Sequence, residues 1–322
     1  MKIGEMKICL IIAQFGRLTS NFDLWLKSCE YNPEINFLVW SDISRENLPE
    51  NVTWINKSFD EFKLLAREKL KLDIYLETPY DCCEFKTVYG IIFEDYLKDF
   101  EYWGYCDMDM IFGDLEYFFQ KYDYRKYDKF LSKGHLTIYR NTEENNNRYM
   151  ISGTPGKDYL SALTQEGITH FDEDEINTIY KINGFPFFGE EIFADICRDY
   201  NRMRLNGLHT DYKLQTFFWQ NGKIFRAFYF HNAVGTNRII NLEEFVYIHF
   251  SKRKMEAPQF DVKNTNAYYI CPHGFKEKTH FGCPLKAEIK ATNPYKGGLY
   301  EKTEWLKYAL RRLNNKIEKF LG

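Results

Sequence analysis

The stretch YWGYCDMDMIF, residues 102–112, places two carboxylates inside a short apolar segment. Residues 103–110 have the length and the apolar character of a buried strand. Because side chains alternate along a strand, Asp107 and Asp109 are expected to point the same way. Two neighbouring carboxylates need a positive partner, and carboxylate oxygens at a strand end suit Mg²⁺ or Mn²⁺. The stretch predicts a metal site, and a solvated turn after the strand is the alternative.

The residues before this stretch predict a sheet. Apolar runs at 7–15, 35–40 and 52–55 read as strands, and residues 22–29 and Phe59–Leu70 have helical spacing, the latter with Ser58 as N-cap. This order predicts an α/β fold with a mostly parallel, Rossmann-like central sheet flanked by helices. Ligands of such sheets bind beyond the carboxyl ends of the strands, so Phe15, Gly16 and Asp42 are expected beside a nucleotide.

Further along the chain, Lys86 precedes a predicted helix at 87–100. A cation is disfavoured at a helix start, so Lys86 is expected to pair with a carboxylate or a phosphate, unless it is a surface lysine. A strand is predicted at 130–140. The acidic residues Asp172 and Glu173 are candidates for a general base, and a solvated helix start explains them equally well.

A late strand at 245–250 contains His249, and Lys252 follows it in a basic run. Imidazole can ligate Mn²⁺, and nearby cations can neutralise a departing diphosphate. His249 is therefore a candidate third metal ligand, although a lone buried histidine is usually structural. Cys271, His273, His280 and Cys283 could bind zinc, but their spacing matches no common zinc module, and an ordinary loop is preferred.

Composition limits the class of protein. The 322 residues carry a net charge of −3, which argues against a nucleic-acid-binding surface. No stretch is long and apolar enough to span a bilayer or to form a signal peptide, which favours a cytoplasmic protein. Residues 302–322 predict a basic amphipathic helix that either packs on the protein or lies on an anionic membrane. We expect a catalytic domain at 1–255 and a C-terminal extension at 256–322.

Together these segments resemble bacterial glycosyltransferases of polysaccharide-biosynthesis clusters, which have a GT-A fold and a D-x-D motif. The resemblance spans roughly residues 7–255 and rests on PYDCCEFK at 79–86, YWGYCDMD at 102–109, FDE at 171–173 and YIHFSKRK at 247–254. Ser251 departs from the pattern, because a larger polar residue is commoner there, and this weakens the assignment of the diphosphate contacts.

This resemblance implies transfer of a sugar from a UDP-sugar to a lipid-linked glycan. The sequence leaves the donor sugar open, and a hexose, either galactose in pyranose or furanose form or glucose, is only a guess. The reaction would take place at the inner face of the cytoplasmic membrane, with residues 302–322 as a possible membrane contact. By position, Asp107, Asp109 and His249 would hold Mn²⁺ or Mg²⁺. Phe15, Gly16 and Asp42 would border the nucleoside, and Lys86 and Lys252 would meet phosphate or a nearby carboxylate.

Two other functions fit the same residues. A metal-dependent nucleotidyltransferase or phosphohydrolase also uses paired aspartates, but it needs further acidic ligands close by. A carbohydrate-binding protein with a structural cation would bind glycan without any affinity for nucleotides. The sequence leaves open whether sugar transfer would invert or retain the anomeric configuration.

Overall fold

The computed structural model describes residues 7–154, 157–198, 200–207, 210–231 and 238–297, together with five positions between 303 and 313. The chain forms two compact units. We call the first unit Met1–Phe22, Ser28–Met108 and Leu115–Glu191, and the second unit Asp23–Lys27, Asp109–Asp114 and Ile192–Gly322. Each unit is described by itself.

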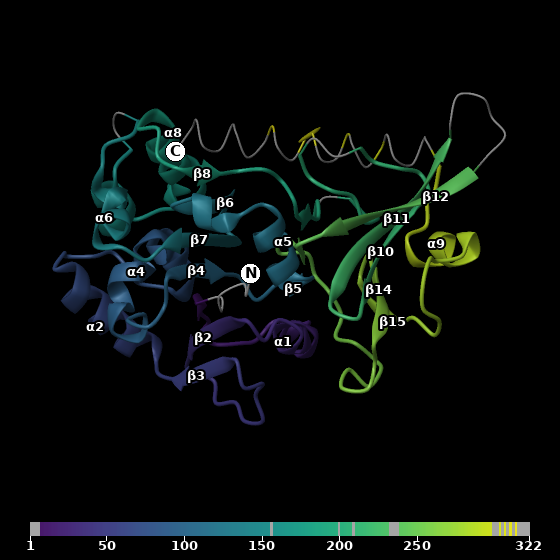
Figure 1. Cartoon of the computed structure of the whole chain (residues 1–322), viewed down its shortest axis with the longest axis horizontal. Coiled ribbons are helices and arrows are strands. Elements are labelled where there is room, and N and C mark those ends of the chain that lie inside the picture. Colours follow the sequence, from purple (N-terminus) through teal and green to yellow (C-terminus); the bar gives the residue numbers. More distant parts are fainter. Residues whose placement is uncertain are drawn as a thin grey trace. The chain divides into compact units, whose positions relative to one another are not determined.

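A seven-stranded sheet in the order β3-β2-β1-β4-β7-β6-β8 organises the first unit (Figure 1). Strands β1, β2, β3 and β4 are parallel to one another, β6 is parallel to β8, and β7 runs antiparallel to both β4 and β6. The strands are β1 Ile8–Ala13, β2 Ile35–Ser41, β3 Val52–Asn56, β4 Tyr102–Cys106, β6 Lys129–Lys133, β7 Leu136–Arg140 and β8 Phe187–Phe188. The prediction of a mixed α/β protein with a mostly parallel sheet is confirmed.

Short helices surround this sheet. They are α2 Phe59–Leu70, α3 Cys82–Phe85, α4 Tyr89–Ile92, α5 Leu115–Lys121, α6 Glu143–Asn146, α7 Tyr159–Thr164 and α8 Ile176–Ile182, whereas α1 Phe22–Glu30 contributes residues to both units. Buried side chains of α2, α4 and α8 share one apolar core with alternate residues of β1 and β4. The predicted N-cap is confirmed, because Ser58 and Glu61 exchange the two hydrogen bonds of a capping box at the start of α2.

Two predicted elements of the first unit are broken up. The helix expected at 87–100 is a series of single turns around α4, with Phe93 stacked on Phe62 and Gly90 against the indole of Trp103. A Cβ on Gly90 would lie 2.4 Å from Trp103 Cε2, so aromatic packing decides the local backbone here. The strand expected at 130–140 is a hairpin, β6 and β7, that turns at Gly134 and His135.

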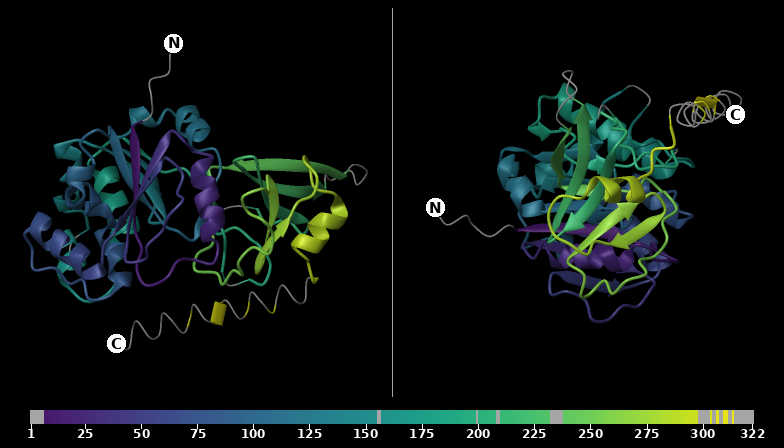
Figure 2. Two further views of the ribbon diagram at one scale, coloured as in Figure 1. Left: turned by 90° about the horizontal axis from the view of Figure 1, so that it is seen from below. Right: turned by 90° about the vertical axis from the view of Figure 1, so that its right-hand side faces the viewer.

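The second unit contains two antiparallel or mixed sheets. Its five-stranded sheet has the order β12-β11-β10-β14-β15, and a three-stranded sheet has the order β5-β13-β9. Its elements are β5 Met110–Phe112, β9 Ala194–Asp195, β10 Gln215–Gln220, β11 Lys223–His231, β12 Arg238–Phe245, β13 Tyr247–His249, β14 Ala267–Cys271, β15 Gly274–Glu277 and α9 Lys286–Thr292. Helix α9 lies beside the larger sheet (Figure 2). Its Ile289 shares a small apolar core with Phe218 and Tyr269 of that sheet.

The division into units differs from the domain boundary expected at residue 255. Strand β14 lies beyond that residue and pairs with β10, which lies before it, so one sheet is built from both sides of the boundary. Within the described part of the chain, no helix is long and apolar enough to cross a membrane. Apart from the five described positions, the predicted amphipathic helix at 302–322 lies outside the described residues.

Candidate functional site

The D-x-D motif lies where the chain passes from the first unit to the second. Strand β4 ends at Cys106 and β5 begins at Met110, so the strand predicted over 103–110 is interrupted by a bend at 107–109. The cause is that β4 pairs within the seven-stranded sheet, whereas β5 pairs with β13 of the second unit. The prediction of one continuous strand over 103–110 was therefore wrong, and Asp107 and Asp109 lie in the bend between β4 and β5. Asp107 belongs to the first unit and Asp109 to the second.

Strand pairing gathers a cluster of polar side chains in the second unit. In the register of the three-stranded sheet, His249 at the end of β13 lies opposite Met110 of β5 and opposite Asp195 of β9. Asp109 directly precedes Met110, so both carboxylates reach the same imidazole. His249 Nδ1 is 2.8 Å from Asp195 Oδ1, and its Nε2 is 3.4 Å from Asp109 Oδ1. We call Asp109, Asp195 and His249 the histidine cluster.

The backbone after β13 completes the histidine cluster. Ser251 and Lys252 both adopt the left-handed region, with φ of 49° and 62°. This conformation lets the Ser251 hydroxyl donate to Asp195 Oδ1 at 2.5 Å, and it lets the Lys252 amide donate to Asp109 Oδ2 at 3.0 Å. Two successive non-glycine residues with positive φ cost energy, and such strain is concentrated at functional sites.

Electrostatics favour a positive charge at His249. Burial alone would lower the pKa of the imidazole, but the carboxylates of Asp109 and Asp195 raise it to about 10. A protonated imidazole therefore compensates the two carboxylates when no metal is bound. A divalent cation could take over this role, because it would displace the Nε2 proton and leave the Asp195 contact at Nδ1 intact.

The donor set also fits such a cation. Two neighbouring ligands of an octahedral Mg²⁺ or Mn²⁺ ion, each about 2.1 Å from the metal, lie about 3 Å apart. Asp109 Oδ1 and His249 Nε2 are separated by 3.4 Å, and Asp195 orients the ring from its other nitrogen, as carboxylates do behind many histidine ligands. Two of the three predicted metal ligands are thus brought together within the second unit.

The third predicted ligand, Asp107, has a cationic partner in the first unit. Lys86 Nζ lies 2.6 Å from Asp107 Oδ1 and also donates to the Gly134 carbonyl at 2.7 Å. Although burial opposes the charge of Lys86, the Asp107 carboxylate raises the pKa of the lysine well above its usual range. The prediction that Lys86 pairs with a carboxylate is confirmed, and the surface-lysine alternative was wrong because the side chain is buried.

Asp172 stands close to this ion pair. It lies in a π-helical turn, Phe171–Glu175, and its side chain is buried against Gly134, where a Cβ would come within 2.2 Å of Asp172 Oδ2. Burial raises the pKa of Asp172 to about 7, with Lys86 opposing the shift and Glu173 adding to it. A carboxyl group that titrates near neutral pH is suited to general base catalysis.

The neighbouring Glu173 has a structural partner. Its carboxylate accepts a hydrogen bond of 3.1 Å from the Gly134 amide and lies 3.9 Å from Lys133 Nζ. The side chain is about one-third exposed, unlike that of Asp172. Of the two predicted base candidates, Asp172 therefore has the more suitable surroundings. We name Lys86, Asp107, Gly134 and Asp172 the lysine cluster.

The predicted nucleoside residues meet at the carboxyl ends of β1 and β2. The Gly16 amide donates to Asp42 Oδ1 at 2.9 Å, and Asp42 is exposed. The ring of Phe15 is buried between Phe59 and Phe62, so core packing accounts for it. Lys252 is exposed next to the histidine cluster. Nucleotide contacts of these four residues stay a prediction.

Sequence reasoning missed two residues of these clusters. Asp195 carries no motif, and only its pairing with β13 identifies it as the partner of His249. Gly134 was predicted only as part of a strand. It lies instead in a turn, where Lys86, Asp172 and Glu173 all contact it. Within the described residues, no metal-binding group includes the four cysteine and histidine residues between 271 and 283, which form a hairpin and the segment after it.

Comparison with known proteins places the chain in a family without assigning an activity. The sequence profile of a family of unknown function, DUF6625, matches residues 10–279, which include both clusters. The chain therefore belongs to this family. No curated protein matches the chain.

Proposed function

We propose that this member of DUF6625 is a metal-dependent glycosyltransferase of GT-A type that uses a UDP-sugar as donor. The observation that carries the proposal is the histidine cluster, in which Asp109 and His249 present an oxygen and a nitrogen 3.4 Å apart and Asp195 orients the ring. Only Met108 separates Asp109 from Asp107, so their Cα atoms lie within about 7 Å of each other whatever the arrangement of the units. Both clusters are thus tied to one short segment of chain.

Each group has a role in this reaction. When bound, Mn²⁺ or Mg²⁺ would neutralise the charge that develops on the departing diphosphate. Lys86 holds Asp107 in place and keeps a positive charge at the motif. Asp172 would accept the proton of the acceptor hydroxyl, because its pKa of about 7 lets a large fraction of the carboxylate exist at neutral pH. A base in this role belongs to an inverting mechanism.

The nucleotidyltransferase or phosphohydrolase alternative is less well supported. It requires further acidic ligands near the motif, and Asp114 was the nearest such residue in the sequence. Asp114 instead lies 3.5 Å from Lys223 Nζ. Asp195 is acidic and close, but it contacts the nitrogen of His249 that faces away from Asp109.

The acceptor in this proposal is a lipid-linked glycan at the inner face of the cytoplasmic membrane. This part rests on the resemblance to polysaccharide-cluster enzymes. The basic residues of 302–322 would supply the membrane contact, since clustered Lys and Arg are attracted to anionic lipids.

Calorimetry with UDP, with and without Mn²⁺, tests the proposal most directly. We expect UDP to bind only when Mn²⁺ is present and UDP-hexoses to be hydrolysed slowly in the absence of acceptor. Asp109→Asn should abolish both the metal-dependent binding and the turnover, because it removes the charged metal ligand. An isosteric amide at this position keeps the volume of the side chain.

Two results would contradict the proposal. Absence of UDP binding under either condition, together with binding of glycan, would indicate a carbohydrate-binding protein. Release of phosphate from UDP or from simple phosphate esters, without release of hexose from UDP-hexoses, would indicate a phosphohydrolase. Asp114→Asn is the matched control, because Asp114 is an acidic residue of the same segment with a lysine partner. It should leave UDP binding unchanged.

A further inference from the structure

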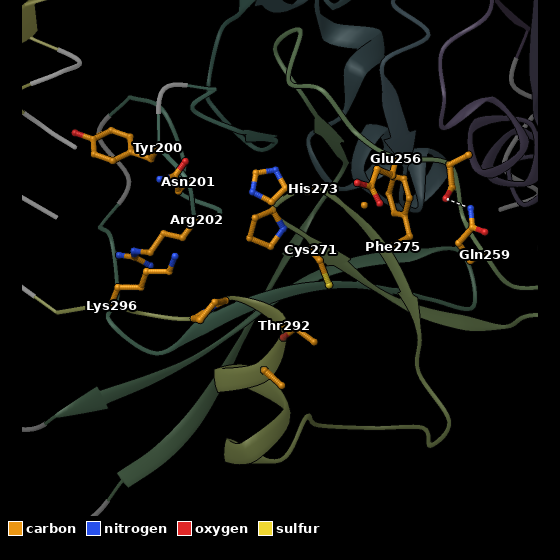
Figure 3. A pocket seen from close by; sticks show the side chains of 15 residues that line it. Tyr200, Asn201, Arg202, Glu256, Gln259, Cys271, His273, Phe275, Thr292 and Lys296 are labelled. Carbon is orange, nitrogen blue, oxygen red and sulfur yellow. Dashed lines mark hydrogen bonds between the residues drawn. The ribbon is translucent and has the colours of Figure 1, made fainter. Parts of the chain in front are cut away.

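The second unit contains a cavity of about 550 Å³ that is lined by residues of neither cluster (Figure 3). Its lining comes from four segments of that unit: residues 200–202, residues 256–259, the hairpin of β14 and β15, and the end of α9 with the residues after it. The volume lies within the range of small-molecule binding pockets. Because all four segments belong to one unit, the cavity does not depend on the arrangement of the units.

The lining combines ring surfaces with neutral hydrogen-bonding groups. Phe275 contributes an aromatic ring, and Asn201 and Gln259 contribute amides. Tyr200 also lines the wall, with its ring against the guanidinium of Arg204. In Figure 3, Glu256, Gln259 and Phe275 lie across from Tyr200 and Asn201, with His273 between them. Aromatic faces suit the C–H faces of sugar rings, and amide and carboxylate groups bind hydroxyl groups as donors and acceptors. The chemistry of the walls is therefore suited to a polyhydroxylated ring.

The charges of the lining argue against an anionic ligand. The guanidinium of Arg202 is ion-paired with Asp211 and donates to the Tyr212 carbonyl at 3.1 Å. The lining also contains one lysine, Lys296, and one glutamate, Glu256, so the formal charges of these two side chains cancel. Burial raises the pKa of the Cys271 thiol to about 11, so that group is neutral. A phosphate would meet no surplus of positive charge here, whereas an uncharged ligand would lose little by desolvation.

Arg253 holds two walls of the cavity in place. Its guanidinium donates to the carbonyls of Tyr200 at 2.7 Å and Asn201 at 3.0 Å on one wall, and to that of Pro272 at 2.5 Å on the other. Arg253 directly follows Lys252, whose amide donates to Asp109. A pocket whose walls are fixed in advance loses less entropy when a ligand binds. The same short segment thus supports the cavity wall and the histidine cluster.

We propose that this cavity is a binding site for a neutral saccharide. Under the proposed function, it would hold sugar residues of the acceptor glycan, but binding of saccharide itself does not depend on that function. The contacts that carry specificity are the exposed polar side chains of Glu256 and Asn201, with the ring of Phe275 as an apolar surface.

Saturation-transfer NMR with methyl glycosides of glucose, galactose, mannose and N-acetylglucosamine, without UDP or metal, tests this inference. We expect transfer from the protein to at least one glycoside at millimolar concentration. Glu256→Ala and Asn201→Ala should each weaken that binding about tenfold, because each removes a hydrogen-bonding partner of a hydroxyl group. Both residues are exposed, so the fold should tolerate the changes. Glu277→Ala, on β15 and outside the cavity, is the matched control.

Absence of transfer to all four glycosides would overturn the inference, as would transfer that Glu256→Ala and Asn201→Ala leave unchanged. These failures are distinguishable from failure of the proposed function. If the protein binds UDP with Mn²⁺ but no glycoside, the proposed function stands and the cavity is not a saccharide site. If the protein binds glycoside in a Glu256-dependent way but binds no UDP, the saccharide site stands and the proposed transferase function is rejected.

Discussion

The two clusters solve the same electrostatic problem with different cations. In the lysine cluster, the ammonium group of Lys86 lies 2.6 Å from Asp107. In the histidine cluster, the imidazole of His249 lies between Asp109 and Asp195. Both acidic residues of the motif are thus compensated, each within its own unit. A buried carboxylate without such a partner would be costly.

The two clusters differ in whether a metal ion could replace the proton that carries the positive charge. An ammonium group has no lone pair near neutral pH, and the pKa of Lys86 is raised further, so this pair is permanent. An imidazole that gives up its Nε2 proton offers a lone pair to a metal. Under the proposed function, we therefore expect Asp109 and His249 to offer the exchangeable metal site, and the lysine cluster to serve the motif by charge and position. Each of the following predictions separates the two clusters.

The largest effect is expected at Asp172. Asp172→Asn should reduce the rate of sugar transfer by about 10²–10⁴-fold, the usual contribution of a general base, and should leave the affinity for UDP and Mn²⁺ unchanged. In the parent protein, kcat/KM should rise with pH up to about 7 and then level off, because the base acts only when deprotonated. Initial rates between pH 5 and 9 check this.

Glu173→Gln is the matched control, because Glu173 is adjacent and acidic but already accepts from the Gly134 amide. It should change the rate far less. A large loss of rate for Glu173→Gln combined with a small loss for Asp172→Asn would exchange their roles.

The pH dependence of stability offers an independent check. The pKa of Asp172 is higher in the folded state than the ordinary 3.8, so stability should fall as pH rises from about 4 to 7. Asp172→Asn should remove that fall.

The next prediction concerns stability alone and tests how strongly the ion pair of Lys86 with Asp107 stabilises the fold. Lys86→Met should lower the free energy of unfolding by about 2–4 kcal/mol, because it leaves the Asp107 carboxylate beside a buried apolar side chain. Asp107 is 30 % exposed, which keeps the loss below that of a fully buried pair. The double variant Lys86→Met/Asp107→Asn should recover most of the stability, as measured by urea denaturation.

Lys63→Met provides the comparison with an exposed ion pair. Lys63 lies 2.6 Å from Glu77, whose side chain is 53 % exposed, so this substitution should cost less than about 1 kcal/mol. Equal losses for Lys86→Met and Lys63→Met would mean that burial does not strengthen the Lys86 pair. The claim that the Lys86–Asp107 pair is a strong and permanent ion pair would then be wrong.

The smallest effect is expected at Asp195, which contacts the Nδ1 atom of His249. Asp195→Asn should weaken Mn²⁺ binding about 10–100-fold, because the carboxylate that orients the imidazole and increases its basicity is lost. Electron paramagnetic resonance of unbound Mn²⁺ during titration measures this. Ser251→Ala removes only the hydroxyl that donates to Asp195 and should cost less. Unchanged Mn²⁺ affinity in Asp195→Asn would show that the metal does not use His249.

The sequence predicted the first unit better than the second. The strands that became β1, β2 and β3 and the capped helix α2 follow from local apolar runs and one capping box, which act over a few residues. The helix expected at 87–100 failed because contacts between distant aromatic residues, such as Phe93 with Phe62, outweigh local helix propensity. Pairing partners are likewise not local, so the antiparallel position of β7 could not be read from the chain.

For the candidate site, the amino-acid sequence by itself identified the chemical groups: Asp107, Asp109, His249, Lys86 and the acidic pair at 172 and 173. Residue type and immediate neighbours were sufficient for that. Only the tertiary structure decided which groups meet, because strand register brings Asp109 and Asp195 to His249, and a hairpin turn brings Gly134 to Lys86 and Asp172. Chemical identity is a property of each residue, whereas proximity and desolvation depend on segments far apart in the chain.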